Sequence, residues 1–280
     1  VEGAASCTQK TCDFPDADIA LAKSKAKGRA HIDFSASKPY LKLDIETAEL
    51  DITPFLPPPA PATSSGLLIS DAFADSPKGW SRAPLDFSAL NHFNADASID
   101  AKKFVARDIV IENAKCEMDV KNGVLSVAIN NADVYGGKGS IGGSLNANGN
   151  AITKRAHFSN IDAHAFLKDA FGEERLSGKA NIEMNASGRG ASEYDIVSSL
   201  QGSGKISFVD GAIRGINLAD MIRNVQSAFK DGVTLGARKT DFAEMGGTFT
   251  IENGVLKNND LMMKAPLLRL SGQGQIDLPQ

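Results

Sequence analysis

The glycine-rich stretch at 137–142 is the first place in the sequence to look for phosphate chemistry. Gly137, Gly139 and Gly142 match the spacing G-x-G-x-x-G of dinucleotide-binding loops. Such a loop needs a helix directly after it, because the amino terminus of that helix receives the pyrophosphate. Residues 143–148 have no helical periodicity, so we interpret these glycines as bends within a strand.

The histidines and acids offer no recognisable catalytic pattern. None of the four histidines, His31, His92, His157 and His164, belongs to an HExxH sequence, and no G-x-S-x-G elbow is present. His157 and His164 could approach each other, but surface positions beside a strand or helix are the simpler interpretation. Because the acids are scattered, a glycosidase-like carboxylate pair stays an open alternative with no pair favoured. We expect no enzymatic activity, no metal and no cofactor.

The three cysteines allow redox chemistry at one place only. Cys7 and Cys12 are close enough in sequence for a short disulfide in an oxidising compartment, and unreacted thiols are the alternative. A zinc site would need two further ligands at a suitable spacing, and none is present. Cys116 lies in phase with Met118 and Val120, which predicts a small buried apolar residue.

Composition bounds the class of protein. The chain has 280 residues and a formal charge of −4, with acids and bases mixed along it. No basic stripe interleaved with aromatic residues appears, so we do not expect nucleic acid as a partner. No apolar run approaches the roughly 18 residues needed to span a bilayer.

Strict alternation of apolar and polar residues is the main structural signal. In Lys179–Ala186, one face holds Ala180, Ile182, Met184 and Ala186, and the other holds Lys179, Asn181, Glu183 and Asn185. Strands of this kind bury one face and expose the other, as antiparallel sheets do. The pattern recurs along the chain and predicts a mainly β protein.

Turn and cap residues punctuate these strands. Asn122-Gly123 and Asn253-Gly254 predict tight type I′ hairpins, and we assign Asp210-Gly211 to the same role. Four short helices are predicted where an apolar residue precedes a capping Asp or Asn, at Asp51, Asp86, Asp162 and Asn217.

A proline-rich segment divides the chain. Residues 57–79 begin with Pro57–Pro59 and read as an extended linker between a strand-rich segment at 1–56 and a longer β domain at 80–280. Trp80, the single tryptophan, follows the linker. A carbohydrate platform is one interpretation of it, and an anchor for the end of the linker is the simpler one.

An ordered set of short motifs resembles the AsmA family of Gram-negative bacteria. The most specific piece is Leu200–Gly202 followed by Asp210–Leu218. The other matching pieces are Lys38–Leu41, Leu50–Ile52, Trp80–Asp86, Gly123–Leu125, Tyr135–Gly137, Leu176–Gly178, Thr240–Phe242, Gly254-Val255 and Gly272–Leu278. The resemblance covers about residues 38–278.

This resemblance implies a periplasmic protein linked to outer-membrane biogenesis, tethered to the inner membrane by an N-terminal helix that is absent from this chain. It implies no catalytic residues. The wider group, with TamB-like proteins, implies transport of phospholipid along an elongated apolar β-groove. A scaffold that assists outer-membrane protein assembly through protein contacts is the alternative.

The fold expected from these signals is an antiparallel, curved or groove-like sheet with about four short capped helices. Its apolar face is either a closed core or an open groove that binds acyl chains. In the groove interpretation, Ala180, Ile182, Met184 and Ala186 contact lipid. Asp210, Gly211 and Asn217 are expected to act only as turn and cap residues.

Overall fold

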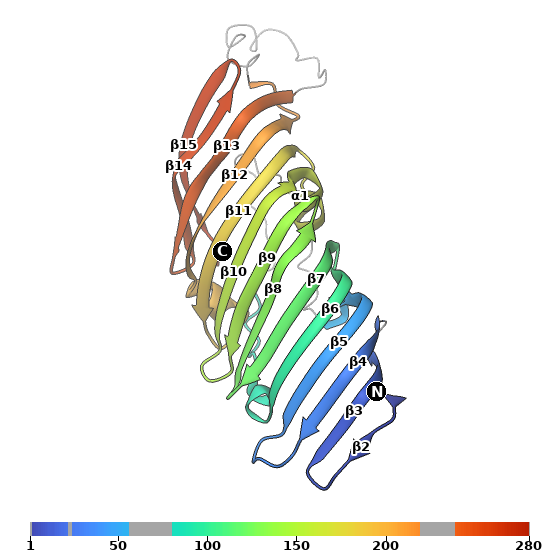
Figure 1. The fold of residues 1–280 in the computed structure, drawn as a ribbon. Helices are drawn as coiled ribbons and strands as arrows, with labels where there is room; N and C mark the ends of the chain where they lie inside the picture. Colours follow the sequence, from blue (N-terminus) through green and yellow to red (C-terminus); the bar gives the residue numbers. More distant parts are fainter. Residues whose placement is uncertain (1, 22–23, 56–79, 219–238, 280) are drawn as a thin grey trace.

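A single long β-sheet forms the body of the protein, as Figure 1 shows. The computed structural model describes residues 2–21, 24–55, 80–218 and 239–279. The strands are β1 (Glu2–Gly3), β2 (Ser6–Cys7), β3 (Thr11–Leu21), β4 (Ser24–Asp33), β5 (Tyr40–Asp51), β6 (Asn94–Ala106), β7 (Ile109–Lys121), β8 (Val124–Val134), β9 (Gly137–Asn146), β10 (Ala151–Asp162), β11 (Leu176–Arg189), β12 (Gln201–Arg214), β13 (Lys239–Glu252), β14 (Val255–Ala265) and β15 (Leu268–Asp277). From β3 onward they lie side by side in chain order, and both β1 and β2 pair with β3.

Strands from both sides of the predicted linker join the same sheet. β5 pairs in parallel with β6, and every other pairing among the described strands is antiparallel. A parallel neighbour requires a long crossover, which the chain between Asp51 and Asn94 provides. The linker itself, residues 57–79, lies outside the described residues.

Two of the three predicted hairpin turns are confirmed. Asn122 and Gly123 have φ values of 52° and 82°, and Asn253 and Gly254 have 50° and 76°. These are the positive values that a type I′ turn requires at both central residues.

The third turn prediction is wrong, because Asp210 and Gly211 lie inside β12. Asp210 has φ 50° and marks the point where the register of β12 shifts against β11. An extra residue in the left-handed conformation produces a bulge rather than a reversal. Gly211 does not have positive φ; it is needed because a Cβ there would collide with the ring of Phe242 and the carbonyl of Ser177.

Similar bulges recur in neighbouring strands. Asn113 in β7, Asn131 in β8 and Asn160 in β10 also have positive φ between residues that are regularly paired. Each extra residue reverses the phase of the alternation, so β10 points Ala156, Phe158 and then Ile161 to the same face. The bulges also bend the strands, since they increase local twist.

The expectation of four helices is corrected to two α-helices within the described residues. α1 (Ala163–Phe171) begins at the predicted cap, where Asp162 Oδ1 accepts a hydrogen bond from the Ala165 amide at 2.9 Å. Asp51 and Asp86 instead accept from amides two residues ahead, and only the short 3-10 helices η1 (Thr53–Phe55) and η2 (Ser88–Asn91) follow. This two-residue bond closes a local turn rather than capping a helix.

The fourth predicted helix lies mostly outside the described residues, and one observed helix was not predicted. Leu218 is helical directly after Asn217, and the rest of the fourth predicted helix lies in residues 219–238, outside the described part. α2 (Glu193–Ser198) was not anticipated; its cap is Ser192, whose hydroxyl accepts from the Asp195 amide at 3.2 Å.

Candidate functional site

The sheet separates an apolar face from a polar face across its whole width. One row of paired residues runs Cys116, Ile129, Ile141, Ala156, Met184, with Gly204 and Phe249 after them. A row on the opposite face runs Asp119, Ser126, Ser144, Thr153, Ser187. We call these the apolar face and the polar face. The apolar face is the candidate functional surface.

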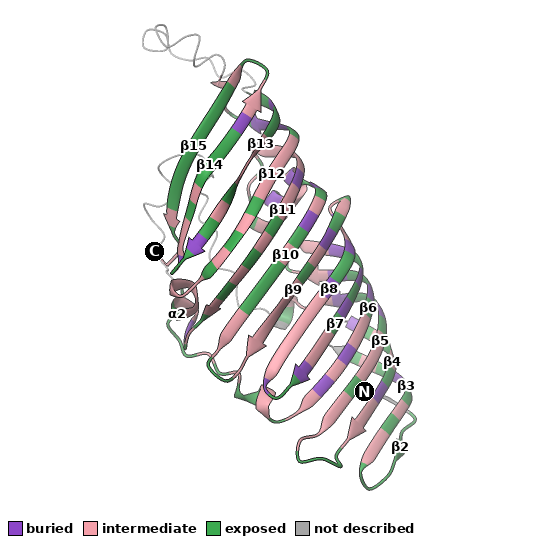
Figure 2. Ribbon diagram, turned by 60° about the vertical axis from the view of Figure 1, so that its left-hand side comes forward, coloured by how far each residue is buried: buried purple, intermediate pink, exposed green. Residues whose placement is uncertain are grey.

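The four predicted lipid-contact residues all lie on the apolar face but differ in burial. Ala180 is fully buried, whereas Ile182, Met184 and Ala186 are half-buried. Figure 2 shows that buried positions along the strands alternate with intermediate and exposed ones. Ala180 is therefore part of a closed core, and the other three lie where the cover becomes incomplete.

Helix α1 closes one end of the apolar face. The buried cluster there includes Phe104, Ile111, Phe158 and Ile161, and α1 contacts β7, β10 and β11 across it. Phe166 of α1 packs with its ring centroid 5.8 Å from those of Tyr135 and Phe158. This end of the face is a packed interior.

A hydrogen bond fixes α1 to the turn between β8 and β9. The Tyr135 hydroxyl donates to Asp169 Oδ2 of α1 at 2.9 Å. Burial, followed by this bond to a carboxylate, raises the pKa of Tyr135 above its ordinary value. Tyr135 also has φ 46°, so its backbone adopts a conformation that non-glycine residues rarely take.

The opposite end of the strands is crossed by the segment 80–93, which we call the rim strap. Trp80 Nε1 donates to the Leu278 carbonyl at 2.6 Å, and the Arg82 guanidinium lies 3.6 Å from the Tyr194 ring centroid. Further on, the Leu85 amide donates to the Ala191 carbonyl at 2.8 Å. Trp80 thus anchors the start of the strap at the last strands, in agreement with its simpler interpretation.

Between α1 and the rim strap lies a stretch of apolar face that we call the apolar band. It consists of Met118, Val127, Ile141, Ala156 and Met184, none of which is buried. Ile141 is 37% exposed although it lies on a central strand. Since a β-branched apolar residue in mid-sheet normally packs against a second layer, the described residues leave this band incompletely covered.

The polar face carries a broad hollow of about 890 Å³. Small residues form its floor on β8 and β9, namely Ser126, Ala128, Ser140, Gly142 and Ser144. Longer charged side chains from the flanking strands form its walls, among them Lys42, Asp96, Glu117, Arg155 and Glu183. The hollow has no Phe, Tyr or Trp side chain in its lining, and it is not the apolar groove expected from the sequence.

The charges of the polar face are mostly engaged with one another. Tyr40 donates to Asp96 Oδ2 at 2.8 Å, and Lys121 Nζ lies 3.2 Å from Asp96 Oδ1. The Tyr40 bond, with a smaller contribution from Lys121, lowers the pKa of Asp96. Asp133 is similarly held by Lys138 and Asn113, which lower its pKa. These pairs are exposed and act mainly to keep this face hydrated.

The structure brings no metal-like or phosphate-like cluster together in the described residues. No group of three or more potential ligands is found there. Gly137, Gly139 and Gly142 lie inside β9, and no helix follows them. His157 lies 3.7 Å from Glu183 on the polar face, whereas His164 belongs to α1.

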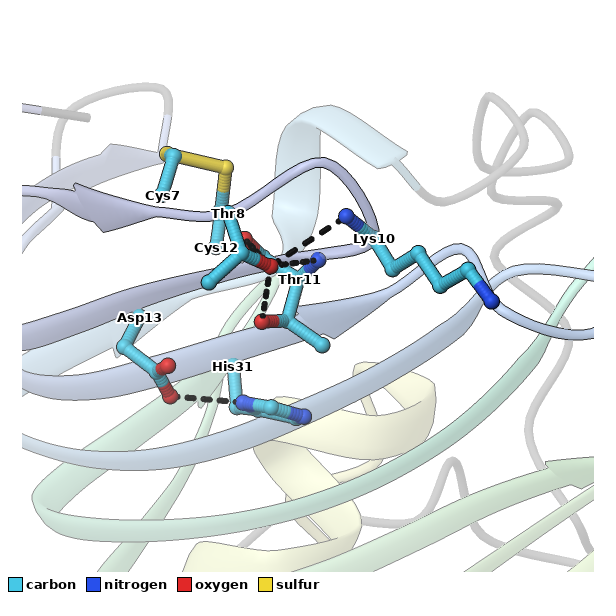
Figure 3. Close-up of a disulfide and its surroundings, with 7 residues drawn as sticks. All are labelled: Cys7, Thr8, Lys10, Thr11, Cys12, Asp13 and His31. Atoms are coloured by element: carbon cyan, nitrogen blue, oxygen red, sulfur yellow. Dashed lines mark hydrogen bonds and ion pairs between the residues drawn. A yellow bond between two sulfur atoms is a disulfide. The ribbon is translucent and has the colours of Figure 1, made fainter.

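The amino-terminal edge carries the cysteine pair. Cys7 of β2 and Cys12 of β3 are joined by a disulfide across their hairpin, and His31 Nδ1 lies 2.6 Å from Asp13 Oδ1 beside it (Figure 3). Cys116 is a free, buried thiol on the apolar face, as its phase predicts. Burial raises the pKa of Cys116, which keeps it protonated and unreactive.

One residue of the apolar face was missed by sequence reasoning. Lys154 pairs with Gly143 and Ala186, so its side chain leaves β10 on the apolar face. The alternation of β10 contains the signal, because Ile152 and Ala156 flank Lys154 in the same phase.

Comparisons with known proteins agree on one family. The model of the AsmA family matches residues 14–261. Protein AsmA of Escherichia coli (strain K12) is 22% identical over 285 residues, which cover 97% of this chain and 45% of that protein. The chain thus spans less than half the length of this relative. No solved structure matches. None of the helices in the described residues has the length and apolar character required to cross a membrane.

Proposed function

The chain belongs to the AsmA family, and from this premise we propose that it is a non-enzymatic periplasmic module that binds phospholipid acyl chains on the apolar face of its sheet. Membership of this family suggests a role in outer-membrane biogenesis or in lipid handling. We also propose that the full-length protein is tethered to the inner membrane, as the family resemblance implies.

The observation that carries the proposal is that the described residues cover the apolar band only in part. Exposed apolar surface costs about 25 cal/mol per Å², so a continuous strip of it in mid-sheet is disfavoured unless something covers it. Each buried CH₂ group stabilises a complex by about 0.8 kcal/mol, so an acyl chain of about 16 carbons is held out of water by roughly 12 kcal/mol. Aliphatic chains match a lining of Met, Val, Ile and Ala, which offers no polar group to recognise.

The composition of the polar face also supports the proposal that lipid binds to the apolar face. It is rich in Ser, Thr, Asn and paired charges, and it stays hydrated while the apolar face is covered. A disulfide between Cys7 and Cys12 suits an oxidising compartment such as the periplasm. These features support a module that shields lipid on one face and contacts water on the other.

The test compares adjacent residues of β11 that point to opposite faces. Met184→Asp places a carboxylate in the apolar band, and Asn185→Asp places the same group on the polar face. Both variants and the parent chain are delipidated, incubated with phosphatidylcholine vesicles, and examined by native mass spectrometry for retained lipid. We expect the parent and Asn185→Asp to retain lipid and Met184→Asp to retain at least tenfold less.

Folding is checked by circular dichroism before the lipid measurement. If Met184→Asp does not fold, Ala156→Ser on the neighbouring strand replaces it as a milder polar change in the same band. A parent chain without retained lipid, or a folded Met184→Asp variant that binds lipid as well as the parent, would contradict the proposal.

A further inference from the structure

Lys154 is the single charged residue among the paired positions of the apolar face in the described part of the sheet. The few polar residues that share this face are uncharged, namely Ser24, Thr47, Thr240 and Asn258. The other charged residues of the paired strands belong to the polar face. A cation placed alone on an apolar surface is unusual, because mixed surfaces normally intersperse both signs.

The described surroundings of Lys154 supply no counter-ion, and its neighbours on this face are small. Its cross-strand neighbours are Gly143 and Ala186, and Gly202 follows Ala186 on β12. No ion pair or hydrogen bond joins the Lys154 ammonium to another described residue, and the side chain is exposed. Several lysines of the polar face differ, since Lys121, Lys138 and Lys264 each contact a carboxylate.

The position of Lys154 relates it to the apolar band. Ala156 lies two residues further along the same face, about 7 Å away at the rise of a β-strand. In the other direction β10 begins at Ala151, beside the end of the sheet that the rim strap crosses. The Lys154 stem can lie along apolar surface while its ammonium reaches water at this end.

We propose that Lys154 anchors the negatively charged headgroup of the lipid whose acyl chains occupy the apolar band. This inference rests on the proposed function and adds to it a preference for lipids of net negative charge. An anionic headgroup supplies a counter-ion that the described residues do not provide, and the neighbours Gly143, Ala186 and Gly202 carry no long side chain that would compete for the ammonium. A zwitterionic lipid carries its own cation, which competes with Lys154 for the phosphate.

The preference expected from one exposed ion pair is modest. Such pairs contribute up to about 1 kcal/mol, which is a fivefold ratio of affinities. Because the interaction is exposed to solvent, the ratio decreases with ionic strength. An acyl-chain contribution to binding does not depend on salt in this way.

The experiment uses vesicles with equal amounts of phosphatidylglycerol and phosphatidylcholine that carry the same oleoyl chains. The delipidated chain is incubated with them at low and at high salt, and the two bound lipids are counted by native mass spectrometry. Lys154→Met removes the charge and keeps an unbranched apolar stem. Arg155→Met makes the same change at the next residue, on the polar face, and is the matched control.

We expect the parent chain and Arg155→Met to bind about fivefold more phosphatidylglycerol than phosphatidylcholine at low salt. Lys154→Met is expected to bind both lipids equally, with unchanged retention of phosphatidylcholine. If the parent binds both lipids without discrimination, or Lys154→Met keeps the preference, this inference is wrong and the proposed function stands. If the parent binds neither lipid, both are wrong.

Discussion

The Tyr135 hydroxyl lies 2.9 Å from Asp169 Oδ2, and this hydrogen bond joins α1 to the turn between β8 and β9. Tyr135 follows the last residue of β8, and Asp169 lies in the last turn of α1. The pair therefore holds the helix over the apolar face near its carboxyl end, while Asp162 caps the other end.

Tyr135→Phe is predicted to loosen this end of α1 without removing the packing of the ring. A hydrogen bond to a charged group contributes about 1.5–3 kcal/mol, and the lower half of this range applies to a half-buried pair. We expect the free energy of unfolding to fall by about 1.5–2 kcal/mol in urea titrations. An unchanged midpoint would show that the aromatic contacts of Phe166 hold α1 on their own.

The same pair predicts a pH dependence at high pH. The pKa of Tyr135 is raised in the folded state, so the folded protein keeps its phenol proton where the unfolded chain has lost it. This contribution is fully present below the ordinary pKa of 10.0 and decreases as the pH rises above it. The stability difference between the parent and Tyr135→Phe should shrink above about pH 10; a constant difference would contradict it. The pKa of Tyr40 is also raised, but Tyr40 is present in both proteins, so its contribution cancels in the stability difference.

Gly211 provides a test of the bulge in β12. An added Cβ would meet the Phe242 ring and the Ser177 carbonyl, so Gly211→Ala should cost about 3 kcal/mol through overpacking. Gly136→Ala is the control, because Gly136 has φ 73° but nothing within 4 Å of an added Cβ. That variant should lose only about 1 kcal/mol from backbone strain. Equal losses in thermal unfolding would argue against the close approach of Phe242.

The disulfide is predicted to stabilise an edge locally. Replacing Cys7 and Cys12 by Ser releases a loop with a sequence separation of 5, which costs about 2 kcal/mol in a chain-entropy estimate. Amide hydrogen exchange should accelerate at Cys12–Phe14 of β3, while β8 and β9 stay protected. Faster exchange throughout the sheet would show that this edge supports the whole fold.

Alternation in the sequence predicts the strands and the apolar face, because each strand buries one side only. The Asn-Gly turns are also readable, since few sequences tolerate positive φ at two consecutive residues. Asp210-Gly211 is misread because the same preference of Asp for positive φ serves a bulge inside a strand. The local sequence does not distinguish a hairpin turn from a bulge at Asp-Gly. The register of the neighbouring strands decides which of the two forms.

The alternation of apolar and polar residues does not predict which part of the apolar face is covered by other elements. Ala180 and Met184 have the same phase in one strand, yet Ala180 is buried under the α1 end and Met184 is half-buried. The difference comes from the position of α1, which packs on β10, β11 and β7 at one end of the face only. Lys154 was overlooked because a single Lys in an alternating strand looks like an ordinary exposed residue until its cross-strand neighbours are known.

The parallel pairing of β5 with β6 has a consequence for the order of assembly. Most neighbouring strands are joined by short connections, so each can pair with the previous one at a small cost in loop-closure entropy. β5 and β6 meet only after the whole segment 52–93 has been closed into a loop. Long-range closure slows folding, and we expect this junction to form last and to set the rate at which the two parts of the sheet become one.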